Sequence, residues 1–287
     1  DRGGKVLLHE DNVYCAEQSS MSGTVLAIIS DSHVGSSTAL APLEFNVHSR
    51  NDFEVQVTKA NKLQRWLYEC WTDYWDHVFK LAKKKRLIVV HCGDLVDGVH
   101  HGSLQVMNEV SDQVEAFMEL MMPVLAKADG FYGVLGTGPS HAGMDNSTEA
   151  QLYRDLGAIE FGQTLTLDID GTIHDFAHHG RAGARPWTSY AANLATEVVY
   201  DYASQGLPIP NFIWRGHRHV IDDSGNKLPG TRAISLPSWQ LKTSFGWRAA
   251  GNTVRSDIGG YIVVDGLLDD SKSRYKGQPD QRKIIVV

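Results

Sequence analysis

The sequence predicts an α/β fold, because short apolar runs typical of buried strands alternate with longer amphipathic segments typical of helices. The runs at residues 24–30, 87–90 and 131–135 are rich in aliphatic and aromatic residues, as expected for strands buried inside a protein. Residues 62–82 and 104–127 place their apolar side chains at helical spacing. We therefore expect strands and helices to share one core.

The second half of the chain continues this alternation. Two strands are expected at 164–169 and 172–177, and the Asp170-Gly171 pair between them is a strong hairpin signal. A helix is expected at about 189–204. Further strands are expected at 211–215, 233–236 and 261–264.

The composition is that of an ordinary globular protein, since 42% of the 287 residues are hydrophobic and 21% are charged. A chain of this length can bury a large core without disulfide bonds. The formal net charge of -7 argues against a broad electropositive surface for long nucleic acids, although a local basic patch is compatible with it. The three cysteines, Cys15, Cys70 and Cys92, have no regular spacing, which favours reduced thiols and a cytoplasmic location.

The expected domain organisation is a polar extension over residues 1–20, without a signal-peptide core, followed by one domain over 21–287. No apolar run approaches the ~20 residues that span a bilayer, so no membrane partner is expected. A helical insertion is expected at about 34–85, in which residues 34–60 are interpreted as irregular loop. Its helix carries three tryptophans, interpreted as core or as a partner surface, with stacking on bases as the alternative.

A glycine-flanked pair of aspartates follows the strand at 87–90. Asp94 and Asp97 stand in the run Gly93-Asp94-Leu95-Val96-Asp97, just past a strand end, where an open α/β sheet places its ligands. Glycine and aspartate are also ordinary turn residues, so this motif alone fits a plain turn equally well.

Two other strands are followed by pairs of metal-binding residue types with one residue between them. Asp31 and His33 follow the first strand, and His217 and His219 follow the strand at 211–215. On an extended backbone, side chains two positions apart lie on the same side, so both members of a pair can bind one ion. A turn is the alternative for the first pair. Crowded imidazoles repel when protonated, so the second pair is best explained by a metal.

Two further loops carry histidines. His178 and His179 directly follow the strand at 172–177. The loop 136–143 contains His141 among several glycines, directly after a strand, which makes His141 a candidate for chemistry.

These five motifs, in this order and each after an apolar strand, resemble the calcineurin-like metallophosphoesterase superfamily over residues 24–219. The region after residue 230, together with the tryptophan-rich insertion, looks like the bacteriophage and prophage branch of that superfamily. The resemblance implies a single α/β domain with two mixed β-sheets packed face to face as a sandwich. Helices would lie outside the sheets in a four-layer arrangement, with the motif loops at one edge.

The resemblance also implies two divalent metal ions, with Mn preferred and Fe, Zn or Ni as alternatives. Because strand alternation sends neighbouring side chains to opposite faces, only one of the two adjacent histidines is expected to face the metals. The implied ligands are Asp31, His33 and His219 for one metal, Asp94 as the bridge, and His217 with either His178 or His179 for the second.

The implied chemistry is hydrolysis of a phosphodiester. Two cations ~3.5–4 Å apart would hold a bridging hydroxide for in-line attack on phosphorus. His141 would donate a proton to the leaving oxygen, and the carboxylate of Asp97 would orient that imidazole. Arg181 and Arg185 would bind phosphate oxygens, with solvated loop arginines as the alternative.

The loop around His141 departs from the superfamily's usual Gly-Asn-His-Asp/Glu. It reads Gly-Thr-Gly-Pro-Ser-His-Ala-Gly, so the asparagine oxygen and the following acid are both missing. A hydroxyl of Thr137 or Ser140, a backbone carbonyl or a water would have to replace the asparagine. We therefore expect the second metal to bind more weakly.

The expected substrate is a phosphate ester, either a nucleotide or the end of a nucleic acid. The acidic charge balance favours small or single-stranded substrates. A phosphomonoesterase or a nuclease on the same site is the alternative within the enzyme class. The alternative from another class is a catalytically degenerate scaffold that docks through the tryptophan-rich helix, but clustered ligands that repel without metal favour the enzyme.

Overall fold

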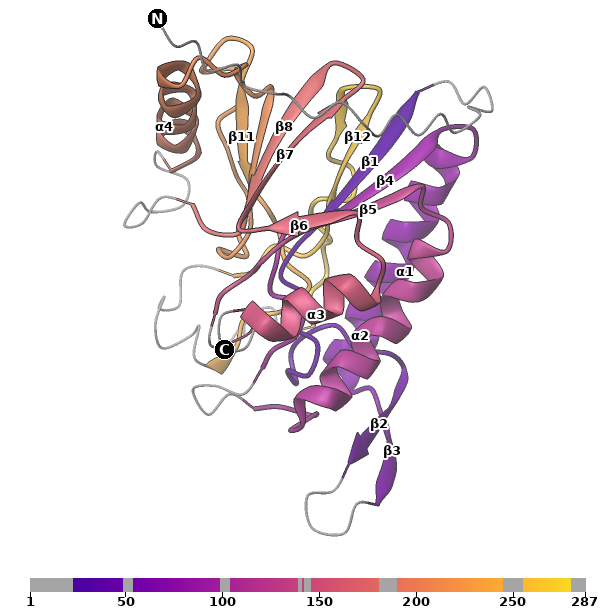
Figure 1. The fold of residues 1–287 in the computed structure, drawn as a ribbon. Helices are drawn as coiled ribbons and strands as arrows, with labels where there is room; N and C mark the ends of the chain where they lie inside the picture. The colour runs from indigo at the N-terminus through magenta and orange to yellow at the C-terminus, as the bar shows by residue number, and fades with distance from the viewer. Residues whose placement is uncertain are drawn as a thin grey trace, which may run out of the picture.

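The computed structural model describes residues 23–48, 54–98, 104–138, 141, 146–180, 190–244 and 255–279. Within these residues the chain forms a mixed α/β fold with three β-sheets and four α-helices, so the expected α/β class is confirmed (Figure 1). None of these four helices is long and apolar enough to cross a membrane.

The larger sheet has six strands. In sheet order they are β13 (Leu267–Asp269), β12 (Tyr261–Val264), β1 (Thr24–Ile29), β4 (Arg86–His91), β5 (Gly130–Val134) and β6 (Glu160–Gly162). β1, β4, β5 and β6 pair in parallel, whereas β12 pairs with β1 in antiparallel orientation. Because parallel strands end at the same edge of a sheet, the segments that follow β1, β4 and β5 lie near one another.

The second sheet has five strands. Its order is β10 (Asp222–Asp223), β11 (Arg232–Ser235), β9 (Phe212–Arg215), β8 (Thr172–Ala177) and β7 (Thr164–Ile169). β7 and β8 form the expected hairpin, with positive φ angles of 53° at Asp170 and 84° at Gly171. β8 and β9 are parallel, so the histidine-bearing segments that follow them also leave the sheet at a common edge.

Buried side chains of the two sheets belong to one hydrophobic cluster. Leu26 and Val90 of the six-stranded sheet pack in this cluster with Phe176 and Trp214 of the five-stranded sheet. Alternate residues of the same strands, such as Val25 and Val89, belong to a different cluster that includes helical residues. The central strands are therefore buried on both faces, which explains their nearly unbroken apolar character.

Helices cover the outer faces. α1 (Lys62–Ala82) and α2 (Val110–Leu125) contribute Tyr74 and Phe117 to the cluster that contains Val25. α4 (Tyr190–Ser204) packs Leu194 against Ile213 of β9. Figure 1 shows α4 on one side of the strands and α1 on the other.

α1 has the bounds that its periodicity predicts. It begins with a capping box, in which the side chain of Asn61 accepts from the N–H of Gln64, and the side chain of Gln64 accepts from the N–H of Asn61. Trp71 and Trp75 are buried and pack edge to face on each other, so these two tryptophans are core residues, as favoured from the sequence.

Some elements differ from the expectation. α2 begins at Val110 rather than at residue 104, and α4 begins at Tyr190. α3 (Ser147–Asp155) and the short strands β6, β10 and β13 were not expected, because none of them carries a long apolar pattern.

The interpretation of residues 34–60 as irregular loop is wrong, because this stretch contains β2 (Glu44–His48) and β3 (Val55–Lys59), which pair in antiparallel orientation (Figure 1). Only Phe45 of these two strands is buried, so the hairpin has little apolar alternation. His48 of β2 contacts Asp112 of α2 through its backbone N–H at 2.9 Å and its Nδ1 atom at 2.6 Å.

Replacing Trp239 tests the helix-side core. Trp239 is fully buried, with its ring 4.9 Å from Trp71 and 5.8 Å from Tyr74 between ring centres. We expect Trp239→Ala to lower the free energy of unfolding by about 3–5 kcal/mol, as measured by urea denaturation. The control Leu267→Ala removes a side chain that is 76% exposed and should change it by less than ~0.5 kcal/mol. Equal effects of the two variants would contradict this packing.

Candidate metal centre

The segments that follow β1, β4, β5, β8 and β9 meet at one edge of the two sheets. Contacts between these segments join residues more than 180 positions apart in the chain, such as His33 and His219. Asp97 and His141 lie beside the site where these segments meet. The structure brings together Asp31, His33, Asp94, Asp97, Thr137, His141, His178, His179, His217 and His219.

Asp31, His33 and His219 form a first group of possible metal ligands. The Oδ1 atom of Asp31 lies 3.1 Å from Nε2 of His219 and 3.8 Å from Nε2 of His33. The two Nε2 atoms are 3.1 Å apart. Donor atoms that share one ion at about 2.1 Å in a tetrahedral site lie about 3.4 Å from one another, so these spacings suit a single ion. The N–H of His217 and the hydroxyl of Ser30 donate to the Asp31 carboxylate and hold it in place.

Asp94 contacts this first group and a second one. Its Oδ2 atom is 3.7 Å from Nε2 of His33 and 3.1 Å from Nε2 of His178. The backbone N–H and the hydroxyl of Thr137 donate to the same carboxylate at 2.6 and 3.2 Å. Asp94 is almost fully buried, so these contacts replace the water that an exposed carboxylate would bind.

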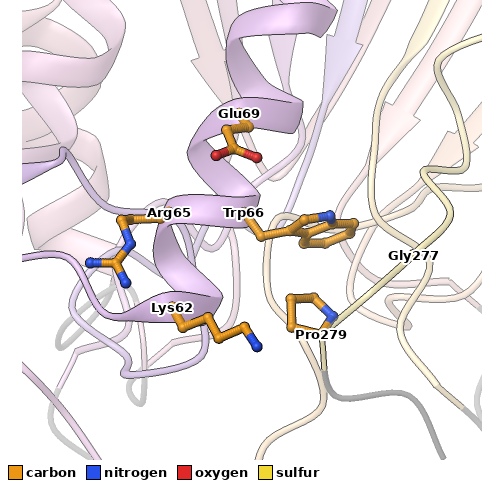
Figure 2. A pocket seen from close by; sticks show the side chains of 6 residues that line it. All are labelled: Lys62, Arg65, Trp66, Glu69, Gly277 and Pro279. Atoms are coloured by element: carbon orange, nitrogen blue, oxygen red, sulfur yellow. The ribbon is translucent and has the colours of Figure 1, made fainter.

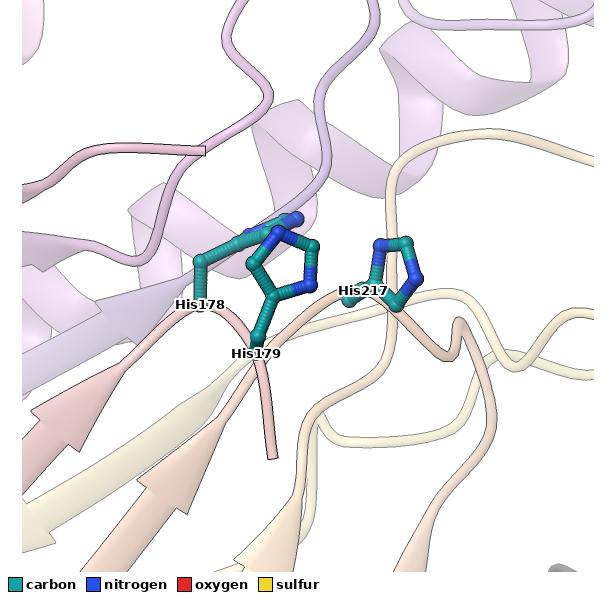
Figure 3. Close-up of side chains that lie close together, drawn as sticks. All are labelled: His178, His179 and His217. Carbon is teal, nitrogen blue, oxygen red and sulfur yellow. The ribbon is translucent and has the colours of Figure 1, made fainter. Parts of the chain in front are cut away.

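The second group consists of His178, His179 and His217, whose rings lie close together (Figure 3). The ring centres of His179 and His217 are 4.4 Å apart, and those of His178 and His217 are 5.2 Å apart. The expectation that His178 and His179 face opposite ways therefore fails. β8 ends at Ala177, so both histidines lie past the strand, where the alternation of faces no longer applies. They differ instead in burial, since His178 is buried and His179 is exposed.

Among the described residues of the glycine-rich loop, Thr137 reaches this second group. Its hydroxyl lies 3.1 Å from Nε2 of His178 and 3.3 Å from Nδ1 of His217. The loop can approach so closely because residue 136 is glycine. A Cβ atom at Gly136 would lie 2.2 Å from Oδ1 of Asp94, which no real structure allows.

The paired ligands were expected to lie on extended backbone, but they do not. Asp31 and His33 have φ angles of 54° and 42°, and His217 and His219 have φ angles of 69° and 56°. Asp94 has a φ angle of 55°. This left-handed conformation is uncommon for residues other than glycine, although Asp and His adopt it more readily than most. The chain thus turns sharply after each strand, and the turns bring the side chains together.

His141 and Asp97 are neighbours, and one contact between them involves the backbone of Asp97. The Nδ1 atom of His141 donates to the backbone carbonyl of Asp97 at 2.7 Å. The Asp97 carboxylate accepts from the side-chain amide of Gln105 at 2.9 Å and lies 3.6 Å from Nδ1 of His33. The backbone of the Asp97 segment therefore contributes to the orientation of His141.

The charges of the cluster suit bound cations. Burial opposes ionisation of Asp31, but His219 and His33 outweigh it and hold the pKa of Asp31 well below its usual range. The pKa of Asp94 is likewise lowered against the effect of burial, mainly by His178. Two ionised, almost fully buried carboxylates surrounded by imidazole nitrogens form a donor set typical of Mn, Fe or Zn. The residues present therefore fit the divalent metals that the resemblance implies.

The imidazoles respond in opposite directions. Burial alone would lower their pKa values, yet Asp31 and Asp97 raise the pKa of His33 to about 10. Asp94 similarly raises the pKa of His178 to about 9. Burial and the neighbouring His178 lower the pKa of His217 to about 4, and the same causes lower the pKa of His179. In the metal-free protein the positive charge thus resides on His33 and His178.

Glu149 of α3 is a site residue that the sequence analysis missed. Its fully buried carboxylate accepts from the N–H of Leu95 at 2.8 Å and from the N–H of Gly136 at 2.5 Å. Burial and the nearby Asp94 raise its pKa to about 7. Glu149 therefore joins the segment after β4 to the segment after β5. No strand end or motif marks it in the sequence.

Three predicted site residues, Ser140, Arg181 and Arg185, lie outside the described residues. Their roles remain predictions from the sequence.

A separate hollow of about 370 Å³ lies at the N-terminal end of α1 (Figure 2). It contains none of the predicted site residues. Trp66, the third tryptophan of α1, lines this hollow. Its role in binding a partner or a base stays a prediction from the sequence. The other lining residues are Lys62, Arg65, Glu69, Gly277 and Pro279.

Comparison with known proteins gives matches in structure only, since no family model and no curated protein matches the chain. An archaeal phosphodiesterase is 12% identical, with 88% of this chain and 97% of that chain covered and a TM-score of 0.37. Yfce, a phosphoesterase from E. coli, is 13% identical, with coverages of 83% and 87% and a TM-score of 0.38. Because these TM-scores are below 0.5, the function proposed below depends on the site itself.

Metal binding should release protons. A ligand imidazole must be neutral, whereas His33 and His178, with pKa values of about 10 and 9, are protonated at pH 7 in the metal-free protein. Raising the pH from 6.5 to 8 should therefore strengthen Mn²⁺ binding. Titration calorimetry at pH 7 in two buffers of different ionisation enthalpy should show proton release. An apparent enthalpy that does not depend on the buffer would contradict this charge assignment.

Proposed function

We propose that the protein is a metal-dependent phosphoesterase of the metallophosphoesterase superfamily that hydrolyses a phosphodiester. The observation that carries the proposal is the buried carboxylate of Asp94. It lies within 3.7 Å of His33 in one group of ligands and within 3.1 Å of His178 in another. Such a shared carboxylate between two sets of imidazoles is suited to a pair of divalent ions.

The proposed ligands follow from the two groups. Asp94 would be shared, and Thr137 would supply the oxygen that asparagine supplies elsewhere in the superfamily. When bound, two such ions would activate a water nucleophile and neutralise charge on the phosphate oxygens. One ion would be held by Asp31, His33 and His219, and the other by His178 and His217, with His179 as an exposed alternative.

His141 is the proposed general acid. Its Nδ1 proton is donated to the carbonyl of Asp97, so Nε2 is the nitrogen that would pass a proton to the leaving oxygen. The ring of His141 lies edge to face on the proposed ligand His33, with 4.5 Å between ring centres. When protonated, this imidazole would lie close enough to the metal ligands to donate a proton to the leaving oxygen of a bound substrate.

The finer parts of the proposal come from the sequence. Arg181 and Arg185 would bind phosphate oxygens, and a nucleotide or a single-stranded nucleic acid would be the substrate. The protein would be a cytoplasmic protein of a bacteriophage or prophage and would have one domain over residues 21–287. Mn²⁺ would be its preferred metal. Two sheets packed as a four-layer sandwich would be its architecture, which the shared cluster of Leu26 and Trp214 supports.

Replacing Asp94 tests this function. We expect Asp94→Asn to lower turnover of a chromogenic phosphodiester with saturating Mn²⁺ by more than ~100-fold, because loss of a residue that merely orients a metal ligand already costs about 10–100-fold. Asp112→Asn is the matched control, since it removes another buried carboxylate that contacts His48 away from the site. Equal turnover in wild type and Asp94→Asn, or none in wild type, would contradict the proposal and favour a scaffold.

A further inference from the structure

We propose that the carboxylate of Asp97 is the positioning partner of the metal ligand His33, and not of the general acid His141. This proposal rests on the metal centre proposed above. The second aspartate of the Gly-Asp-x-x-Asp motif would then orient a metal ligand and not the residue that transfers the proton.

The two ring nitrogens of His33 have different surroundings. Its Nε2 atom faces Asp31, Asp94 and His219, at 3.8, 3.7 and 3.1 Å. Nε2 is therefore the atom that can bind an ion. A neutral imidazole that binds metal through Nε2 carries its one proton on Nδ1, and that N–H needs an acceptor when it is buried.

Asp97 is suited to be this acceptor. The Nδ1 atom of His33 is buried and has no hydrogen-bond partner among the described residues. An oxygen of the Asp97 carboxylate lies 3.6 Å from it, slightly beyond hydrogen-bond range. A small movement of the ring would close this gap and fix the tautomer that exposes Nε2 to the metal.

Other residues hold the Asp97 carboxylate at His33. Gln105 donates to its Oδ2 atom at 2.9 Å, and Gln240 donates to its Oδ1 atom at 3.4 Å. The Asp97 side chain is 2% exposed, so bulk water does not replace these donors. His141 donates from Nδ1 to the backbone carbonyl of Asp97 at 2.7 Å, and an isosteric substitution of the Asp97 side chain retains this carbonyl.

The test compares metal binding with leaving-group dependence in Asp97→Asn. Binding of Mn²⁺ alone to the metal-free protein is followed by the electron paramagnetic resonance of free Mn²⁺. We expect Asp97→Asn to weaken one class of Mn²⁺ site by about 10–100-fold, and Asp112→Asn to leave both classes unchanged. At saturating Mn²⁺, turnover of aryl phosphodiesters should fall by the same factor for good and poor leaving groups. In His141→Ala the loss should grow as the leaving group becomes poorer.

Other outcomes would overturn the proposal. Wild-type Mn²⁺ affinity in Asp97→Asn, with or without a loss that grows for poorer leaving groups, would return Asp97 to His141 or to a structural role. A wild-type protein that binds Mn²⁺ but hydrolyses no ester would refute the proposed function only, because the Mn²⁺ titration still decides the role of Asp97. A wild-type protein that binds no Mn²⁺ would refute both.

A second variant keeps the test decisive if circular dichroism shows that Asp97→Asn is unfolded. Gln105→Ala keeps the carboxylate and removes the donor at 2.9 Å, on a half-buried side chain. It should weaken the same Mn²⁺ site several-fold, by less than the 10–100-fold typical of removing the direct partner of a ligand. Unchanged affinity in Gln105→Ala would then overturn the proposal.

Discussion

Asp94 contacts loops of both large sheets. Its carboxylate meets His33 after β1, Thr137 after β5 and His178 after β8. This contact requires Gly136, because any larger residue at that position would collide with Asp94. Glu149 joins the segments that follow β4 and β5, because it accepts from the N–H groups of Leu95 and Gly136. The single buried carboxylate of Asp94 thus contacts three of the loops that form the site.

The arrangement is costly for a protein without bound cations. Left-handed backbone at a residue other than glycine costs on the order of 1–3 kcal/mol, and five of the clustered residues adopt it. Asp31 and Asp94 are almost fully buried, and the imidazoles beside them, including protonated His33 and His178, keep both carboxylates ionised. Divalent ions would replace those protons. Strain and charge that concentrate at one sheet edge are typical of a functional site, whereas the cluster of Trp71 and Trp239 behind it supplies packing.

The sequence was sufficient for the α/β class and for most of the described residues that meet at the site. Long apolar runs predicted the central strands, and the chemistry of Asp and His after each run predicted the cluster. Contacts that involve no pattern could not be predicted. Glu149 comes from a short helix, the hairpin of β2 and β3 buries only Phe45, and Asp97 presents its carbonyl to His141. The spacing of Asp31 and His33 also led to the correct grouping through an incorrect backbone conformation.

Anomalous diffraction from a crystal grown with Mn²⁺ tests the central claim most directly. We expect two peaks in the anomalous difference map that share Asp94 as a ligand. One peak should contact His33 and His219, and the other should contact His178 and Thr137. Full-occupancy Mn²⁺ bound elsewhere on the protein, with no peak beside Asp94, would contradict the account.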